Sequence, residues 1–503
     1  MQKKIGFDNE KYLEEQSRAI IERAERIGGR LYLEFGGKVA HDYHAARVLP
    51  GYDPNVKVRL LQRLRDQTEI IICIYAGAIE RRKIRADFGI PYDLDALRLI
   101  DDLQEWGLLV RAVVITRFDG QPSAHIFKSR LERRGIPVYT HGSTRGYPTD
   151  VDRIVSKEGY GANAYIPAQR PVVVVVGPGP GSGKLATCLS QLYHEHLRGC
   201  KAGYAKFETF PVWNLPLKHP VNVAYEAATV ELRDVNQIDP FHLAAYGVQA
   251  VNYNRDIEAF PLLARILERI GVPTLYRSPT DMGVNRAGFA IVDEEVVCQA
   301  AEQEVIRRYF RYACEYALGL VEKEDAERAL LLMKELGLDE NQRTVVQPAR
   351  QAAQEAEAKG KGNNGIYCGA AIELPDGHIV TGKNSPLMHA ASAAVLNAIK
   401  YLSHIPDELP LLTPNVLESI ANMKKDILRM KSVSLDLDET LIALGISAAT
   451  NPAAQLATGH LRELAGCEFH TTHMPTAGDE AGLRRLGLNA TSDPQFPTRS
   501  LLL

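Results

Sequence analysis

The strongest chemical signal in the sequence is a glycine-rich segment between positions 177 and 184. Its residues are, in order, Gly177, Pro178, Gly179, Pro180, Gly181, Ser182, Gly183 and Lys184. Glycines let the backbone approach a ligand closely, and a lysine adds a mobile positive charge. The segment, called the glycine loop below, therefore predicts a site for a phosphate group.

The residues on both sides of the glycine loop predict the elements that position it. Five consecutive valines, residues 172–176, favour a buried strand. From Leu185 to Leu197, leucines recur at helical spacing, which predicts a helix whose first N–H groups have no partner. Strand, glycine loop and helix in this order are typical of phosphate-binding loops.

The spacing of the loop differs from two standard nucleotide motifs. A Walker A loop has about four residues between its first glycine and the Gly-Lys pair, whereas Gly177 leaves five and Gly179 leaves three. Leu185 stands where that motif has a hydroxyl for Mg²⁺, and the nearest hydroxyls are those of Ser182 and Thr187. The dinucleotide pattern G-x-G-x-x-G is also absent. The loop thus indicates a phosphate ligand rather than an ATPase, and a purely structural turn is the alternative.

Polar segments that follow other predicted strands are expected at the same edge of a sheet, since ligands of open α/β sheets bind beyond the carboxyl ends of the strands. In the densest of these segments, residues 276–286, Arg277 could grip an anion and Asp281 could hold Mg²⁺ or accept a proton. Turn capping explains the same residue types without a ligand. Two other segments qualify, with Lys206, Glu208 and Thr209 in one and Asp234, Asn236 and Asp239 in the other.

These observations give one set of candidate site residues. The predicted catalytic residues are Lys184, Arg277 and Asp281. The predicted ligand-binding residues are Gly177, Gly179, Gly181, Ser182, Gly183, Lys184, Thr187 and Asn285. No metal site is predicted, and the expected ligand is ATP or another phosphate-bearing compound, with or without Mg²⁺.

Short apolar runs alternate with longer amphipathic stretches through the first part of the chain, which predicts a mostly parallel, doubly wound α/β sheet. Helices are expected over 12–27, 93–105 and 258–270. The expected strands are 30–35, 69–75, 110–116, 172–176, 203–207, 223–230 and 274–276. We predict an α/β phosphate-binding domain over 1–294, a helical region over 295–347 and a smaller α/β domain over 348–503.

The smaller domain contains a segment, residues 369–402, that resembles the cytidine-deaminase fold. A predicted hairpin, 366–373 and 378–381, turns at Asp376-Gly377 and leads to a helix that starts at His389, where that fold has a metal-binding histidine. Ala391 replaces the glutamate that those enzymes need, and no P-C-x-x-C follows. The resemblance implies a zinc-free relative of the fold, one of which transfers a formyl group, so Lys383, Asn384 and His389 form a second candidate site.

Two further motifs in this domain have structural interpretations. Residues 436–440 read D-x-D-x-T, the phosphatase signature of haloacid-dehalogenase enzymes, but no long strand leads into Asp436 and a helix start is favoured. His470 and His473 could offer two imidazoles, but no third ligand is evident, so surface histidines are expected.

Composition limits the partners of the chain. Lys and Arg number 59 against 62 Asp and Glu, so the basic surface of a nucleic-acid binder is not expected. No stretch approaches the roughly 20 apolar residues of a membrane span, and the first residues lack a signal-peptide core. A cytoplasmic protein without a membrane partner is expected. Its seven cysteines form no C-x-x-C, so neither a disulfide framework nor a zinc ribbon is predicted.

With these residues in view, the full chain is similar to a bacterial family of conserved proteins of unknown function. The segments that carry the resemblance are the glycine loop with 186–191, then 206–214, 278–285 and 383–400. The resemblance implies a glycine-loop α/β core, a helical region and a C-terminal subdomain similar in topology to deaminases, and it implies no reaction.

Three hypotheses on function remain open at this point. The first is an enzyme of phosphoryl or group transfer, a nucleotide-dependent transferase or ligase, acting on a small phosphate-bearing molecule at the glycine loop. The second is a non-catalytic binding or regulatory protein that uses the same loop, for which Leu185 in the Mg²⁺ position is the motivation. The third places a formyl-transferase-like activity in the C-terminal domain. The sequence leaves the oligomeric state open, a homo-oligomer included.

Overall fold

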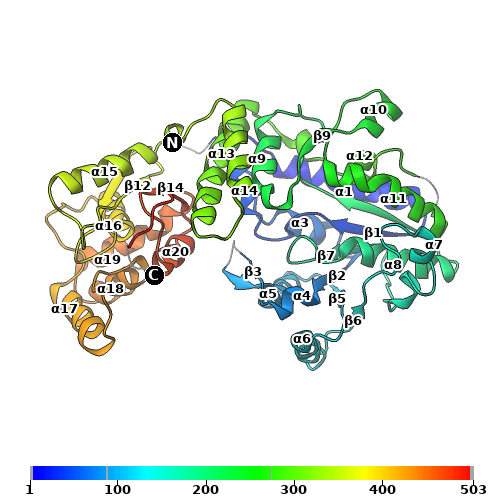
Figure 1. Cartoon of the computed structure of the whole chain (residues 1–503), viewed down its shortest axis with the longest axis horizontal. Coiled ribbons are helices and arrows are strands. Elements are labelled where there is room, and N and C mark those ends of the chain that lie inside the picture. The colour runs from blue at the N-terminus through cyan, green and yellow to red at the C-terminus, as the bar shows by residue number, and fades with distance from the viewer. Residues whose placement is uncertain (1–3, 86–88, 273–274, 499–503) are drawn as a thin grey trace. The chain divides into compact units, whose positions relative to one another are not determined.

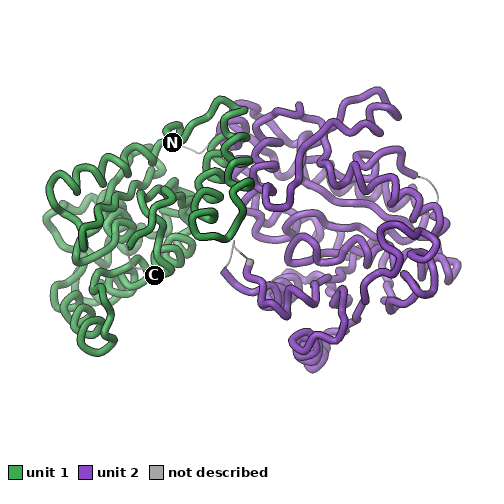
Figure 2. The backbone as a smooth tube through the Cα atoms, in the orientation of Figure 1, with its two compact units in different colours: residues 1–3, 302–503 green, residues 4–301 purple. Residues whose placement is uncertain are grey.

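The computed structural model describes residues 4–85, 89–272 and 275–498, which form two compact units. The first unit comprises Lys4–Ala301 and the second begins at Glu302 (Figure 2). The division falls inside the long helix α13, Glu294–Ala317. Most of the predicted helical region, residues 302–347, therefore belongs to the second unit.

A seven-stranded sheet forms the core of the first unit, and all its neighbouring strands are parallel (Figure 1). The spatial order is β11 (Gly283–Val284), β8 (Ala202–Phe207), β1 (Arg30–Phe35), β7 (Val172–Val176), β2 (Thr68–Tyr75), β5 (Val110–Thr116) and β6 (Val138–His141). The central strands are buried along most of their length, as apolar strands between two helical layers are. The predicted mostly parallel α/β sheet is thus confirmed.

Helices cover both faces of this sheet because the chain changes direction at β7. From β1 through β2 and β5 to β6 the chain moves one way along the sheet, and from β7 through β8 to β11 it moves the other way. Right-handed crossovers in opposite directions place their helices on opposite faces. One face carries α8 (Lys184–Leu197) and α11 (Asn254–Ile270), and the other carries α1 (Asn9–Ile27), α3 (Val56–Arg63) and α5 (Tyr92–Glu105).

Shorter elements complete the first unit. Two small antiparallel ladders pair β3 (Ile84–Arg85) with β4 (Ile90–Pro91) and β9 (Asn236–Ile238) with β10 (Val251–Tyr253). The remaining helices are α2 (Tyr43–Val48), α4 (Ala76–Glu80), α6 (Pro122–Glu132), α7 (Val151–Ile154), α9 (Pro220–Ala228), α10 (Pro240–Tyr246) and α12 (Pro279–Met282).

Two of the predicted strands are wrong. Residues 223–230 lie mainly in helix α9, which begins at Pro220 and is capped by the imidazole of His219; its apolar residues are buried at helical spacing, a pattern that the short run did not reveal. Leu275 and Tyr276 are not in a strand, and Thr274 lies outside the described residues. The strand that pairs with β8 at this edge is β11, a few residues later.

The second unit contains a four-stranded sheet. Its order is β13 (Ile379–Lys383), β12 (Gly369–Glu373), β14 (Glu468–Thr471) and β15 (Asn489–Ser492), with β12 antiparallel to both neighbours and β14 parallel to β15. The predicted hairpin is present, and helix α16 (Ala390–Leu402) follows it with His389 at its N-cap. The other helices are α14 (Lys323–Glu335), α15 (Val346–Ala358), α17 (Pro414–Asn422), α18 (Leu437–Ala448), α19 (Pro452–Thr458) and α20 (Ala477–Arg485).

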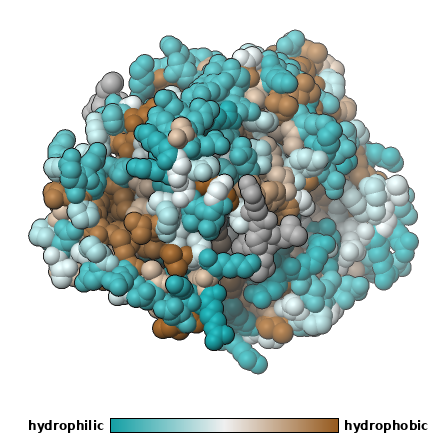
Figure 3. Space-filling model, turned by 60° about the vertical axis from the view of Figure 1, so that its left-hand side comes forward, coloured by the Kyte–Doolittle hydropathy of each residue, from teal (hydrophilic) through white to brown (hydrophobic). Residues whose placement is uncertain are grey.

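The surface is mixed in polarity. Figure 3 shows one face on which hydrophobic side chains form separate patches among hydrophilic ones. Exposed apolar side chains include Ile442 and Ile446, one turn apart on α18. Within the described ranges, no helix has the length and apolar character needed to cross a membrane.

Candidate functional site

The glycine loop lies at the carboxyl end of β7, between the neighbouring strands β1 and β2. Because every strand of this sheet points the same way, the loops that follow β1, β2, β5 and β8 open at the same edge. The helix that begins directly after the loop, α8, starts at Lys184. The loop therefore occupies the position at which open α/β sheets bind their ligands, next to the point where the chain changes direction.

The backbone of the glycine loop requires glycine at several positions. Gly181 and Gly183 have φ of 70° and 91°, in the left-handed region that residues with a Cβ rarely adopt. A Cβ on Gly183 would also lie 2.7 Å from the side chain of Thr116, and one on Gly179 would lie 2.4 Å from the ring of Tyr92. Conformation and close packing thus account for these glycines without a ligand.

Three features of the loop are not explained by packing. The hydroxyl of Ser182 is buried, with the residue 4% exposed, and has no hydrogen-bond partner in the described part of the chain. The side chain of Lys184 makes no hydrogen bond or ion pair to any described residue. The backbone N–H groups of Gly183, Lys184 and Leu185 likewise meet no acceptor within the described ranges. All three are groups that can donate hydrogen bonds to an anion.

The Ser182 hydroxyl points into the curl of the loop. A Cβ placed on Gly177 would lie 2.3 Å from Ser182 Oγ, so this oxygen sits against the Cα of Gly177. The end of β5 holds the loop from outside, because Thr116 Oγ1 donates a hydrogen bond to the Ser182 carbonyl at 2.7 Å and Arg117 donates to the carbonyl of Gly181. The donors are therefore fixed in place before any ligand binds.

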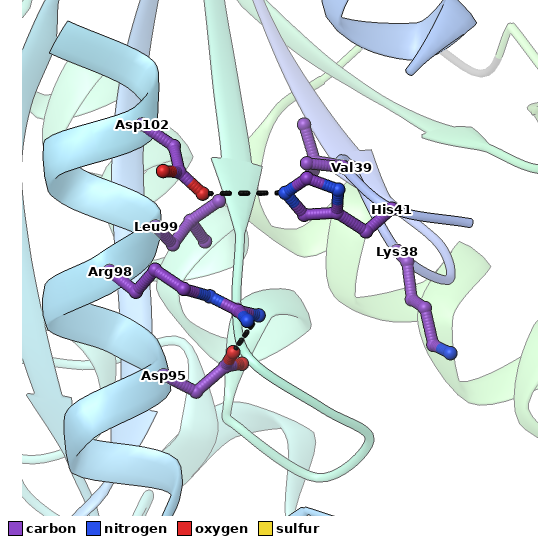
Figure 4. A pocket seen from close by; sticks show the side chains of 9 residues that line it. Lys38, Val39, His41, Asp95, Arg98, Leu99 and Asp102 are labelled. Carbon is purple, nitrogen blue, oxygen red and sulfur yellow. Dashed lines mark hydrogen bonds and ion pairs between the residues drawn. The ribbon is translucent and has the colours of Figure 1, made fainter. Parts of the chain in front are cut away.

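A small polar pocket adjoins the loop at Gly177 (Figure 4). Helix α5 presents Asp95, Arg98 and Asp102 on one side, and the loop after β1 presents His41 on the other. Arg98 donates to Asp95 at 2.6 Å, and His41 Nε2 lies 3.6 Å from Asp102 Oδ2. These residues could not be predicted from the sequence, because nothing in their spacing shows that α5 faces the loop after β1.

A buried cluster of ionisable groups lies at the carboxyl end of β8. Lys206 Nζ contacts Glu208 Oε1 at 2.8 Å and also bonds the carboxylate of Asp256 and the hydroxyl of Tyr253. Burial raises the pKa of Glu208 to about 7, with Lys206 offsetting part of the rise. Burial alone would lower the pKa of Lys206, but the carboxylates of Asp256 and Glu208 outweigh it and raise that pKa. Perturbed carboxyl and amine groups of this kind are found at acid–base sites and also in structural ion pairs.

Glu34 of β1 lies between this cluster and the glycine loop. In the sheet it pairs in register with Lys206 on one side and with Val175 of β7 on the other. It accepts a hydrogen bond from Tyr204 at 2.7 Å. Glu34 was not among the predicted site residues, although a single carboxylate in an apolar strand was a usable signal.

The predicted residues of the segment 276–286 do not contact the glycine loop. Asp281 accepts hydrogen bonds from Tyr246 Oη at 2.9 Å and from the backbone N–H of Arg277 at 3.2 Å. The guanidinium of Arg277 is exposed and lies 5.6 Å from the Tyr246 ring centroid. β11, which lies within this segment, stands three strands from β7, about 14 Å at normal strand spacing. Among the described residues, no hydrogen bond or ion pair joins Arg277 or Asp281 to Lys184.

Two predicted ligand-binding residues have local roles. Thr187 is fully buried, and its hydroxyl bonds the sulfur of Cys73 at 3.4 Å. The amide of Asn285 donates to the carbonyls of Thr209 and Pro211 at 3.3 and 2.9 Å, which holds the segment after Glu208 in place. Asn285 thus stabilises the backbone beside the Lys206 cluster.

The other polar residues predicted near the sheet edge cap or brace short elements. Asp239 caps α10 and accepts a hydrogen bond from Thr280 Oγ1 at 2.7 Å. The backbone N–H of Asn236 donates a hydrogen bond to Glu226 Oε2 at 3.1 Å, and Asp234 pairs with Arg255 at 3.0 Å. The cap by Asp239 is of the kind that explains such residues without a ligand, and the contacts of Asn236 and Asp234 brace the elements beside it.

One group of three side chains has the composition of a metal site. His219 Nε2 lies 2.9 Å from Glu294 Oε1 and 3.5 Å from Cys298 Sγ. However, His219 Nδ1 accepts the backbone N–H of Val221 at 3.2 Å, so in the neutral ring the proton must reside on Nε2. A ring nitrogen that carries a proton cannot ligate a metal, and the group is best described as a hydrogen-bonded helix cap.

The second candidate site lies in the other unit, and its three residues are not equivalent. Lys383 pairs with Glu355 at 2.7 Å, and Asn384 is held by the backbone of Cys368 and Ile366. His389 Nδ1 lies 2.7 Å from Asp479 Oδ2. Burial would lower the pKa of His389, but the Asp479 carboxylate outweighs it and raises that pKa.

Asp479, which sequence reasoning missed, is the anchor of this site. It is 5% exposed and accepts hydrogen bonds from the Leu437 backbone N–H at 2.9 Å and from Thr476 Oγ1 at 2.8 Å. Within the described part of the chain, the second ring nitrogen of His389 has no hydrogen-bond partner. The arrangement is that of an oriented imidazole whose free nitrogen can exchange a proton.

The two remaining motifs of this unit have structural roles. Asp436 forms a capping box with Glu439 at the start of α18, which confirms the helix-start interpretation of the D-x-D-x-T motif. His470 is fully buried in β14, bonded to Thr491 Oγ1 at 2.9 Å, so the expectation of a surface histidine is wrong there. The strand alternation of β14 turns His470 inward, which two nearby histidines alone could not indicate.

Comparison with known proteins gives one consistent result. Residues 5–337 match the family profile described as "Domain of unknown function DUF1846, N-terminal", and residues 341–502 match its C-terminal counterpart. A UPF0371 protein of Clostridium tetani is 57% identical over 500 residues, covering 99% of each chain. UPF0371 proteins of Clostridium botulinum strain 657 and of Fusobacterium nucleatum are each 58% identical, again over 99% of both chains.

Proposed function

The chain belongs to the DUF1846 family of unknown function, and we propose that its Lys4–Ala301 unit binds a nucleotide or another phosphorylated small molecule at the glycine loop. The observation that carries this proposal is a set of donors that meet no acceptor among the described residues: the Ser182 hydroxyl, the Lys184 amine and the first N–H groups of α8. A buried hydroxyl without a partner is costly, about 1–3 kcal/mol, so such a group is retained where a ligand completes it.

The electrostatics of the loop support the same conclusion. The partial positive charge at the start of a helix attracts an anion, and α8 places it beside the Lys184 ammonium. A phosphate in the loop would meet the backbone donors, the hydroxyl and the amine together. A neutral ligand would satisfy the hydroxyl but not the charge.

Chemistry at this site is the more specific part of the proposal. Glu34, Lys206 and Glu208 lie at the same sheet edge, one and two strands from β7. A carboxyl group whose pKa is about 7 can accept and return a proton near neutral pH, as a group transfer to a hydroxyl requires. The unit then acts as a transferase or ligase. If the Lys206 cluster has only a structural role, the protein binds its ligand at the glycine loop without converting it and acts as a sensor.

The test of this proposal measures binding and turnover separately. Thermal unfolding is recorded with ATP, GTP, pyrophosphate and orthophosphate, with and without Mg²⁺, for the wild type, Lys184→Ala and the control Lys201→Ala, an exposed lysine just beyond the other end of α8. At least one phosphate compound should raise the wild-type melting temperature by mass action, Lys184→Ala should lose the rise, and Lys201→Ala should keep it. An equal rise in Lys184→Ala would remove the assignment of the loop. Product formation that Glu208→Gln abolishes would favour the enzyme over the sensor.

A second candidate function rests on the His389–Asp479 pair in the other unit. The oriented imidazole suits general acid–base catalysis of group transfer, including the formyl transfer that the resemblance to a zinc-free deaminase-like fold suggests. Elemental analysis of the purified protein is expected to find no stoichiometric zinc. Bound zinc that His389→Ala releases would contradict this version, because a metal would then occupy the nitrogen that must carry the proton.

A further inference from the structure

Cationic side chains surround the outer side of the glycine loop. Arg117, at the end of β5, donates to the Gly181 carbonyl, and its guanidinium lies 3.6 Å from the ring centroid of Tyr75. Arg81 approaches the same ring, at 5.9 Å from its centroid. Arg81 and Arg117 therefore lie against the same tyrosine ring, and Arg117 also bonds the loop backbone.

A third cation reaches the loop through another tyrosine. Lys83 Nζ lies 5.5 Å from the ring centroid of Tyr92. That ring is the one that packs against Gly179, close enough to exclude any Cβ there. Lys83 and Arg117 thus approach the loop at Gly179 and Gly181, two residues apart in the chain.

These cations are exposed, and no carboxylate of the described residues pairs with them. None of Arg81, Lys83 and Arg117 forms an ion pair with a described residue, and all three are exposed. The neighbouring carboxylate of Glu80 accepts the backbone N–H of Ser123 at 3.0 Å. Together with Lys184, the outer side of the loop carries four positive charges, more than one phosphate group needs.

The backbone around the loop is also strained. Among the described residues, seven other than glycine have positive φ, and three of them lie here: His41 at 55°, Arg82 at 48° and Arg117 at 48°. His41 lines the pocket beside Gly177, and Arg82 stands between the two cations of the α4 end. Such conformations cost about 1–3 kcal/mol each and cluster at ligand sites.

We propose that the ligand of the glycine loop carries two or more linked phosphates, with the first held inside the loop and the next held by Arg117, Arg81 and Lys83. This inference rests on the proposed function, since it takes the loop as the phosphate site. The class of ligand is a di- or triphosphate, free or attached to a larger group. An orthophosphate or a simple monophosphate ester reaches the loop donors but leaves the outer cations unpaired.

The experiment is calorimetric titration with orthophosphate, pyrophosphate and inorganic tripolyphosphate at two salt concentrations. The wild type should bind tripolyphosphate about tenfold or more tightly than orthophosphate at low salt, and the preference should shrink at high salt. The double variant Arg81→Gln/Lys83→Gln should lose most of the preference. The control is Arg133→Gln/Arg134→Gln. These two arginines follow α6 and precede β6, so they lie at the amino ends of the strands, away from the loop, and the control should keep the preference for tripolyphosphate.

The outcomes separate this inference from the proposed function. Equal affinity of the wild type for the three compounds, abolished by Lys184→Ala, would overturn the inference and leave the phosphate site in place. If Arg81→Gln/Lys83→Gln and Arg117→Gln both still bind tripolyphosphate more tightly than orthophosphate by the wild-type factor, these cations do not have the proposed role. Absence of binding by all three compounds, or binding unaffected by Lys184→Ala, would contradict both proposals. Thermal unfolding of each variant verifies that it is folded.

Discussion

The Ser182→Ala substitution separates a ligand-binding role of the glycine loop from a structural one. The Ser182 hydroxyl is buried and has no partner among the described residues, so its removal deletes a group that is desolvated without compensation. The desolvation of such a group costs about 1–3 kcal/mol. In the free protein, Ser182→Ala should therefore leave the free energy of unfolding unchanged or raise it by up to about 1 kcal/mol, since the small void left behind offsets part of the gain.

Ligand binding should respond in the opposite direction. A hydrogen bond from a hydroxyl to a charged phosphate contributes about 1.5–3 kcal/mol, which corresponds to a loss of affinity of about 10- to 150-fold. Urea unfolding of the free protein gives the first quantity, and calorimetric titration with tripolyphosphate gives the second. An unchanged stability together with weakened binding in Ser182→Ala is expected only if the hydroxyl has no partner in the free protein and donates to the ligand in the complex.

Ser190→Ala is the matched control. Ser190 lies on α8, the helix that follows the glycine loop, and is fully buried, but its hydroxyl donates to the Tyr160 carbonyl at 3.1 Å. Its removal should destabilise the protein by about 1 kcal/mol and leave binding unchanged. The reasoning is refuted if Ser182→Ala destabilises the free protein as Ser190→Ala does, because the Ser182 hydroxyl would then already have a partner.

Three further predictions concern the same unit. Gly183→Ala combines a left-handed backbone with a Cβ placed 2.7 Å from Thr116, and should lower the free energy of unfolding by about 2–4 kcal/mol in urea; an unchanged midpoint would contradict the loop geometry. Glu208 has a raised pKa of about 7, so the folded state binds its proton more tightly and the stability from this group falls as pH rises from about 4.5 to 7. Glu208→Gln should flatten that part of the stability profile, and an unaltered profile would show that Glu208 is ionised throughout. Asp42→Asn leaves the buried ammonium of Lys57, bonded to Asp42 at 2.8 Å, without its anion and should cost about 3–5 kcal/mol, whereas a stable variant would mean that Lys57 finds another partner.

The parts of the fold that the sequence revealed are those with a dominant local pattern. The strand of five valines and the leucine-spaced helix after the loop lie almost where they were expected, because a buried parallel strand is apolar throughout and an amphipathic helix repeats. The strand predicted over 223–230 was wrong because this segment has no dominant local pattern. Its apolar run was short, and the cap by His219 and the proline that starts α9 outweighed its β-branched residues.

The candidate site was predictable only in its contiguous part. The glycine loop stands together in the sequence, so its residue types and order could be read directly. Asp95, Asp102 and His41 meet because α5 packs beside the loop after β1, and Asp479, which meets His389, lies 90 residues later in the chain. Such pairs depend on the order of strands and helices in space, which spacing along the chain does not encode.

The segment 276–286 was predicted to belong to the ligand site because it is rich in polar residue types. Its polar side chains cap α12 and brace the turn beside α10, so their density reflects turn formation. Thr187 was predicted as a ligand-binding residue because it follows the lysine closely, but its position on the helix turns its hydroxyl toward the sulfur of Cys73. For this segment and for Thr187, the role of a side chain depends on the direction in which it points, which its residue type does not show.

The most direct test of the phosphate site is a crystal structure of the wild-type protein with tripolyphosphate or ATP. The account predicts a phosphate group against the backbone N–H groups of Gly183, Lys184 and Leu185, with Ser182 Oγ and Lys184 Nζ within hydrogen-bond distance. A ligand bound elsewhere, with the glycine loop unoccupied at saturating concentration, would contradict it.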